Sequence, residues 1–280
     1  MLPGFVIGLR EGLEAALIVG VVLGVLRRVG RPGQSRAVWA GVCAAVVVSL
    51  AAGVLLNRMG LALEGRAEAI FEGLTMLVAA GVLTWMIFWM QKQGRHTTSA
   101  LERDALQAAS RQGAGLLFGL AFVAVVREGL ETALFLTAAA LSVAAAANPA
   151  GGQTLLGAAL GLLVAAVLGW AIYQGGRRLN LRAFFQATGA LLILFAAGLL
   201  SQGIHELQEA ALLPLTIAPL WDLSALLSEG STLGGVLKTL FGYNANPSLL
   251  EACSYAAYLL VVVAAFFGAR RATRQLPAHV

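Results

Sequence analysis

Two copies of one charged motif interrupt an otherwise apolar chain. The sequence Arg-Glu-Gly-Leu-Glu occurs at residues 10–14 and again at residues 127–131. Residues three and four apart are neighbours on one helix face, so the second glutamate of each copy would lie beside both the arginine and the first glutamate. One arginine cannot balance two glutamates, and the excess carboxylate needs a cation. Carboxylate oxygens suit hard or borderline cations such as Fe³⁺, Fe²⁺ and Mn²⁺.

Further metal-ligating side chains lie near two other apolar runs. Glu72 falls inside the third run, and Glu68 precedes it by about one helical turn. We expect both to contribute to the cation path. After the sixth run, a continued helix would present His205, Glu206 and Glu209 together as an external capture site. The alternative for these three residues is an ordinary solvated helix end.

The composition indicates that the chain is a membrane protein, so these charged residues lie in or near membrane-spanning segments. The chain has 280 residues, of which 59% are hydrophobic and 12% charged, and its mean hydropathy is +0.82. A soluble domain has about 25% charged residues, so the soluble, disordered and disulfide-rich classes are excluded. The two cysteines, Cys43 and Cys253, form neither a metal-ligand spacing nor a disulfide framework.

Seven apolar runs are long enough to cross a bilayer as helices, which needs roughly 20 residues each. Strands are excluded because isolated strands would leave backbone groups unpaired in lipid. The sequence therefore predicts an all-α, polytopic membrane protein with seven transmembrane helices. The runs are 2–26, 37–56, 69–91, 114–143, 154–174, 183–203 and 252–269.

Basic residues predict the orientation of these helices. Fourteen of the 19 lysines and arginines fall in alternate connections and in the tail after the seventh run. Because cytoplasmic loops are rich in Lys and Arg, the N-terminus is expected outside and the C-terminus in the cytoplasm. Aromatic residues at the cytoplasmic helix ends, Trp85 and Trp89 among them, are expected to be interfacial anchors. The net charge of +5 is then explained by the basic residues of the cytoplasmic connections, and it does not indicate nucleic-acid binding.

An internal duplication is indicated by matches at one offset. The motif copies are 117 residues apart, and residues 79–83 match residues 196–200 at the same offset. Three runs per copy is an odd number, so the second copy would be inverted, as in many transporters. We expect a single transmembrane domain over 1–280 with a 3+3 inverted repeat plus one extra helix. Its parts are repeat one (about 1–112), repeat two (about 113–210), an external loop (204–251) and a seventh helix (252–269).

Several functions remain compatible with buried acids. The motif charges can be structural ion pairs, although packing alone would need only one acid for each arginine. Transport of another divalent cation such as manganese, a proton-coupled antiporter, and a membrane di-iron oxidase are the alternatives. The usual di-iron sites use Glu-x-x-His pairs, and neither motif has a nearby histidine in the sequence. No hydrolase triad, phosphate loop or dinucleotide fingerprint is present, so a transporter is favoured over an enzyme.

The doubled motif, the acidic third run and the segment 203–210 resemble the oxidase-dependent iron permease family, which comprises fungal high-affinity permeases and bacterial EfeU-type proteins. The resemblance implies an iron permease of the inner (plasma) membrane, with iron as transported substrate and no permanently bound cofactor. It implies that an iron-oxidising or iron-delivering extracytoplasmic protein works with the chain, and it leaves homo-oligomerisation open. It also implies roles for six motif residues. Glu11, Glu14, Glu128 and Glu131 would handle iron, and Arg10 and Arg127 would support them.

Overall fold

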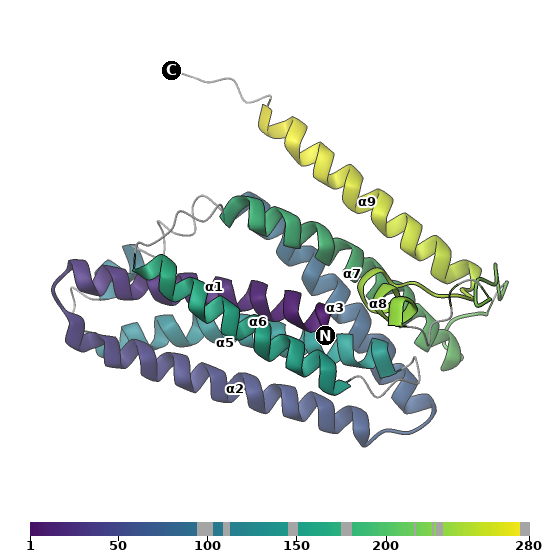
Figure 1. Cartoon of the computed structure of the whole chain (residues 1–280), viewed down its shortest axis with the longest axis horizontal. Helices are drawn as coiled ribbons and strands as arrows, with labels where there is room; N and C mark the ends of the chain where they lie inside the picture. Colours follow the sequence, from purple (N-terminus) through teal and green to yellow (C-terminus); the bar gives the residue numbers. More distant parts are fainter. Residues whose placement is uncertain are drawn as a thin grey trace. The chain divides into compact units, whose positions relative to one another are not determined.

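The described part of the computed structural model is built mainly from helices (Figure 1). The structure describes residues 1–93, 103–108, 113–144, 151–174, 181–215, 217–225, 227 and 232–274, and these contain no strand. The all-α class is confirmed, and the seven apolar runs are helical throughout except for the last residue of the fifth run. The helices are α1 (Leu2–Arg28), η1 (Pro32–Gln34), α2 (Ser35–Leu61), α3 (Arg66–Gln93), α5 (Ala114–Ala144), α6 (Gly151–Tyr173), α7 (Leu181–Glu209), α8 (Thr232–Phe241) and α9 (Leu249–Arg274).

Four helical stretches in the described residues are long and apolar enough to cross a membrane. They are Pro32–Leu61, Arg66–Met90, Gly152–Tyr173 and Ala183–Glu209, and the apolar part of α9 is shorter. The helices α1 and α5 are also long, with 27 and 31 residues, but each carries the three charged residues of its motif. Large apolar side chains such as Val47 and Leu50 on α2 are exposed, which suits contact with lipid rather than water.

The chain divides into two units, and the division falls inside α3 and α7. Unit 1 contains residues 1–64 and 85–189, and unit 2 contains residues 65–84 and 190–280. In unit 1 the most extensive helix contacts join α1 to α6 and α2 to α5, and α1 also packs against α5. This packing brings the two motif-bearing helices into contact with each other.

Small residues allow the helices of unit 1 to approach closely. The glycines Gly4, Gly8 and Gly12 repeat every four residues along the face of α1 that meets α6. A Cβ on Gly8 would lie 2.5 Å from the carbonyl oxygen of Ala158 in α6. On the opposite side of the contact, a Cβ on Gly161 would lie 2.6 Å from the backbone nitrogen of Leu9. The backbones of α1 and α6 therefore touch where only hydrogen atoms fit.

The end of α1 is fixed by a left-handed glycine and an apolar cluster. Gly30 has φ +73°, and the Arg31 amide donates to the Leu26 carbonyl at 3.0 Å, as in a Schellman cap. Residues 103–108 form a short helical stretch. The cluster that packs around this end consists of Val22, Val25, Leu26, Val38, Ala105, Ala108, Leu117 and Ala121.

Unit 2 contains the predicted external loop, which is more ordered than the sequence indicated. The helix α7 continues to Glu209, six residues beyond the predicted apolar run, and α8 is a helix that the sequence analysis did not predict. The described residues between them form no regular helix, and hydrogen bonds such as that from Leu220 N to Pro247 O (2.8 Å) tie this segment to the one before α9. Hydrogen bonds from Ser224 lower the pKa of the Asp222 carboxyl in this loop.

The α1–α6 contact predicts unequal effects of two glycine substitutions. Gly161→Ala should lower the free energy of unfolding by about 1–3 kcal/mol, because its methyl group meets the backbone of α1. Gly24→Ala is the matched control, since nothing lies within 4 Å of its added Cβ and alanine favours helix by about 1 kcal/mol. Thermal unfolding of both variants in detergent checks this. Equal stability of the two variants would contradict the close packing.

Candidate cation site

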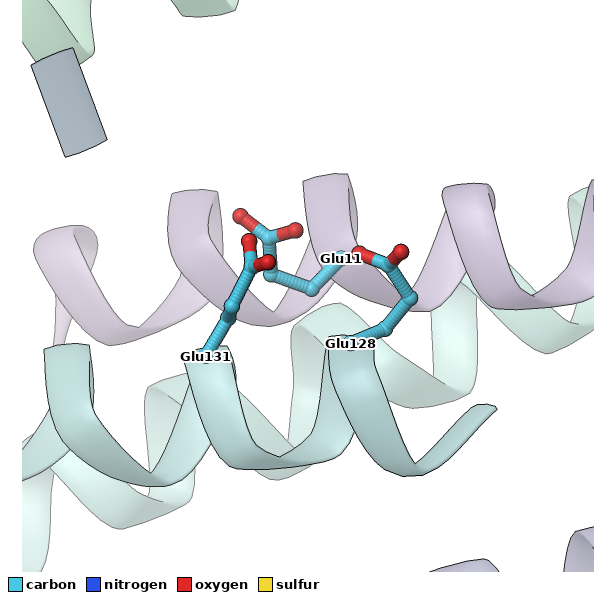
Figure 2. Close-up of side chains that lie close together, drawn as sticks. All are labelled: Glu11, Glu128 and Glu131. Carbon is cyan, nitrogen blue, oxygen red and sulfur yellow. The ribbon is translucent and has the colours of Figure 1, made fainter. Parts of the chain in front are cut away.

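Three buried glutamates converge where α1 packs against α5 in unit 1. Ligand oxygens of Glu11, Glu128 and Glu131 all lie within 4.8 Å of one another. Figure 2 shows Glu11 reaching from α1 toward the two glutamates of α5. All three side chains are buried. The motif spacing accounts for this geometry, because Glu128 and Glu131 are three apart and so share one helix face.

Arg10 is enclosed beside this group and has four partners. Its Nη1 donates to Glu11 Oε1 at 2.8 Å and to Met86 Sδ at 3.2 Å. Its Nη2 lies 3.3 Å from Glu14 Oε1 and donates to Met90 Sδ at 2.8 Å. Only 2% of its side chain is exposed. Glu14 is therefore linked to the cluster through Arg10 and is not one of the three converging glutamates.

Arg127 has different surroundings although its motif has the same sequence. Its Nε donates to Glu131 Oε1 at 3.0 Å, and 36% of its side chain is exposed. The guanidinium carbon lies 4.6 Å from the ring centroid of Trp89 and 5.7 Å from that of Trp85, within range of a cation–π interaction. Arg127 is thus held by one carboxylate and two aromatic faces.

Four carboxylate oxygens in this region are buried without a hydrogen-bond partner in the described structure. They are Glu11 Oε2, Glu14 Oε1, Glu128 Oε2 and Glu131 Oε2. A buried acceptor without a partner costs free energy, typically about 1–3 kcal/mol and more when charged. A cation bound among Glu11, Glu128 and Glu131 would give the unpaired oxygens of these three residues a partner. Oxygen-only donor sets suit hard and borderline divalent ions.

The glycines inside the motifs serve the neighbouring helices. A Cβ on Gly12 would lie 2.8 Å from the Cβ of Ala165 in α6, and one on Gly129 would overlap the side chain of Ser49 in α2. These two glycines therefore permit close helix approach at the α1–α6 and α5–α2 contacts.

A second acidic group lies in unit 2, where α3 and α7 pack closely. A Cβ on either Gly73 or Gly203 would be 3.0 Å from the carbonyl oxygen of the other. Near this contact, Glu72 of α3 and Glu206 of α7 are close enough for their charges to repel. Unit 2 therefore carries a second group of acidic side chains on these two helices.

The acids of this second group do not form a compact ligand set. Glu68 and Glu209 also act on the charge of Glu72, but no three acids or histidines of unit 2 bring ligand atoms together among the residues described. Glu206 is buried, whereas 61% of the Glu209 side chain is exposed. These residues suit attraction of a hydrated cation better than tight binding.

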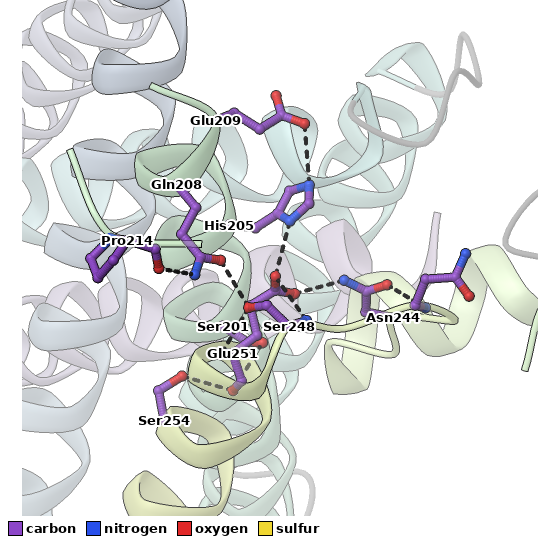
Figure 3. Close-up of polar contacts among 10 residues, drawn as sticks. Ser201, His205, Gln208, Glu209, Pro214, Asn244, Ser248, Glu251 and Ser254 are labelled. Carbon is purple, nitrogen blue, oxygen red and sulfur yellow. Dashed lines mark hydrogen bonds and ion pairs between the residues drawn. The ribbon is translucent and has the colours of Figure 1, made fainter. Parts of the chain in front are cut away.

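His205 connects α7 to the start of α9. Its Nε2 lies 3.4 Å from Glu209 Oε1, and its Nδ1 lies 3.1 Å from Glu251 Oε1 (Figure 3). Glu251 also accepts hydrogen bonds from Asn244 Nδ2 at 2.7 Å and from the Ser248 amide at 3.3 Å. The Glu251 amide donates in turn to Ser248 Oγ, which completes a capping box for α9. The structure thus places His205 beside Glu209 and gives it a second, structural partner in Glu251, and the external capture site stays a prediction.

Comparison with known proteins identifies the family of the chain. The model of the iron permease FTR1 family matches residues 1–274. The chain belongs to this family. It is 38% identical over 269 residues to the ferrous iron permease EfeU of Escherichia coli strain UTI89, with 95% of each chain covered. It is 38% identical over 277 residues to that of Yersinia pestis, with 98% of this chain and 95% of the relative covered. No solved structure matches it significantly.

Family membership agrees with the apolar helices in identifying a membrane protein, and the relatives are named as permeases rather than enzymes. The resemblance inferred from the doubled motif is therefore confirmed. The roles of the individual glutamates stay predictions, because family membership assigns no residue.

Four residues of α3 beside the motif arginines were not recognised in the sequence. Met86 and Met90 contact Arg10, and Trp85 and Trp89 lie against Arg127. The two tryptophans had been interpreted only as interfacial anchors. The available signal was the four-residue spacing of each pair, which places each pair on one face of α3.

The two arginines should tolerate lysine differently. Arg10→Lys should lower the free energy of unfolding by about 3–5 kcal/mol, because an ammonium cannot reproduce the fork that holds Glu11 and Glu14 in a buried site. Arg127→Lys should cost about 1 kcal/mol or less, because that ion pair is partly exposed. Unfolding of the purified variants in detergent measures both. Equal losses would contradict the difference in their surroundings.

The capping box predicts that Glu251 is structural. Glu251→Ala should destabilise the protein by about 1–3 kcal/mol, because His205 and Asn244 lose a buried acceptor and α9 loses its capping carboxylate. Iron uptake per folded molecule should stay at the wild-type level. Thermal unfolding and uptake are measured on the same preparation, with Glu64→Gln, at an exposed position, as control. Lost uptake at unchanged stability would instead make Glu251 part of the cation path.

Proposed function

We propose that this chain is an iron permease that imports Fe²⁺ across the bacterial inner membrane, and that Glu11, Glu128 and Glu131 hold the ion in transit. The observation that carries the proposal is the set of buried carboxylate oxygens without hydrogen-bond partners at the α1–α5 contact. The names of the relatives, ferrous iron permeases, support Fe²⁺ as the cargo.

The charge of the motif residues favours a divalent ion. Four ionised glutamates and two arginines sum to −4 + 2 = −2, and one Fe²⁺ neutralises this charge. A trivalent ion would leave a positive charge among buried groups, which is unfavourable in a low-dielectric surrounding. Mn²⁺ has the same charge and similar ligand preferences, so charge alone does not separate it from iron.

The site offers little for di-iron oxidase chemistry. The usual sites of that class place a histidine three residues after a glutamate. Among the residues described, His205 is the one histidine, and it lies in unit 2 rather than in the unit that holds the three glutamates. A permease therefore fits the described geometry better.

The proposed architecture has seven spans with an inverted repeat of α1–α3 and α5–α7. Crosswise packing supports it, because the first helix of each copy lies against the second helix of the other. Individual contacts correspond in the same way. The approach of Gly12 to Ala165 is matched by that of Gly129 to Ser49. The approach of Gly157 to Met1 is likewise matched by that of Gly41 to Phe118.

In this proposal the N-terminus is outside and the C-terminus is cytoplasmic. The acids Glu68, Glu72, Glu206 and Glu209 attract the ion before it reaches the buried glutamates. A separate extracytoplasmic protein delivers the iron, in line with the partner that the family resemblance implies. The positive charge of the alternate connections supports the orientation.

The proposed role of the motif glutamates predicts loss of transport. Glu128→Gln and Glu131→Gln should each lower Fe²⁺ uptake into proteoliposomes by about tenfold or more, the effect of losing roughly 1.4 kcal/mol or more of binding. Glutamine keeps the side-chain volume, so both variants should still insert and fold. Glu64→Gln, at an exposed position outside the helices, should transport normally.

Two controls make this result specific. Competition by Mn²⁺ at equal concentration separates an iron permease from a general divalent transporter. Dioxygen consumption by the wild-type protein with Fe²⁺ separates a permease from an oxidase. Normal uptake by both glutamine variants, or iron-dependent dioxygen consumption by the purified chain, would overturn the proposal.

A further inference from the structure

The two copies of the motif hold their arginines in unequal ways. Arg10 uses both terminal nitrogens on carboxylates and thioethers, and its side chain is almost fully enclosed. Arg127 uses Nε on Glu131 alone, leaves more than a third of its side chain exposed, and rests on aromatic faces. Of these two arginines, only Arg127 is both partly exposed and in contact with aromatic rings, so only Arg127 has room to move and a partner other than a carboxylate to move toward.

A cation bound by the three glutamates would weaken the ion pair between Arg127 and Glu131, because Glu131 belongs to both. Glu131 Oε1 accepts from Arg127, and Glu131 Oε2 is one of the unpaired oxygens. A divalent ion bound by Glu131 would repel the guanidinium beside it, and the repulsion is strong where water is scarce. Arg127 must then give up part of its interaction with Glu131.

The tryptophans form a platform for the displaced guanidinium. The rings of Trp85 and Trp89 lie one helical turn apart on α3, with centroids 6.3 Å apart and planes inclined by 30°. A guanidinium stacks well on such faces. The attraction grows when no carboxylate neutralises the cation, so this contact should be stronger with the metal bound than without it.

We propose that Trp89, with Trp85 beside it, is a positioning residue that retains Arg127 when the transported cation takes Glu131. Arg127 is then the movable member of the pair of arginines, and Arg10 is the fixed one. A contact that is stronger in one state shifts the equilibrium toward that state, so the tryptophan face favours the metal-bound form. This inference rests on the proposed function, because it assumes that Glu131 binds the cargo.

The transport test compares substitutions that differ only in aromatic character. Trp89→Leu should raise the KM for Fe²⁺ in proteoliposomes by about 2- to 30-fold, the range of a cation–π interaction converted to affinity. Trp89→Phe should restore part of the loss, and the maximal rate should change little in either variant. Trp170→Leu, at an exposed tryptophan of α6, is the matched control and should behave as wild type. Equal KM values for Trp89→Leu and Trp89→Phe would overturn the proposal.

A spectroscopic test does not depend on transport or on a Trp89 substitution. A chain in which Trp89 is the sole tryptophan, with the others changed to phenylalanine, is titrated in detergent with Zn²⁺, which does not quench by paramagnetism. The Trp89 emission should change on Zn²⁺ addition, and Arg127→Gln in the same background should abolish the change. No change, or an equal change without Arg127, would overturn the proposal. Absence of iron uptake by the wild-type protein would instead overturn the proposed function and leave this titration as the deciding test.

Discussion

Unit 1 is organised around one electrostatic constraint, which is that its buried carboxylates outnumber the cations beside them. An uncompensated charge in a low-dielectric interior is expensive, and a permanently unbalanced cluster would not be retained for stability alone. Arg10 and Arg127 offset half of the charge of the four motif glutamates. The remaining negative charge lies on carboxylate oxygens that have no hydrogen-bond partner, and a transported cation can bind them. The imbalance is the feature on which the function rests.

The helix packing of unit 1 brings the buried carboxylates close enough together to share a cation. Two helices that carry buried charges must lie close enough for their acids to share a cation, and the α1–α5 contact brings Glu11 near Glu128 and Glu131. Glycines at the flanking contacts let α6 and α2 press against these helices from outside. The helix α3 then contributes the thioethers and aromatic faces that make the two arginines unequal. Identical motifs thus acquire different roles from their tertiary neighbours.

Much of this arrangement follows from local patterns in the sequence. The apolar runs gave the helices, since each is long enough for only one kind of element in lipid, and the motif spacing placed Glu128 and Glu131 on one face. The capping box of α9 was also readable, because Ser248 and Glu251 have the required spacing, although it was not recognised in the sequence.

Other features depend on contacts between residues far apart in the chain. Met86 and Met90 lie more than 70 residues from Arg10, and no periodicity indicates that they meet it. The helix α8 is only ten residues long and contains two glycines, so it was too short to register as a span. Its existence depends on packing rather than on intrinsic preference.

The ligand environment of the bound iron tests the central claim most directly. The purified wild-type chain is loaded anaerobically with one equivalent of Fe²⁺ and examined by X-ray absorption at the iron edge. The account predicts a first shell of oxygen atoms alone, with the carbon scattering of carboxylates behind it, because the converging ligands are glutamates. A shell that contains imidazole nitrogen or thioether sulfur would contradict it and place the iron elsewhere.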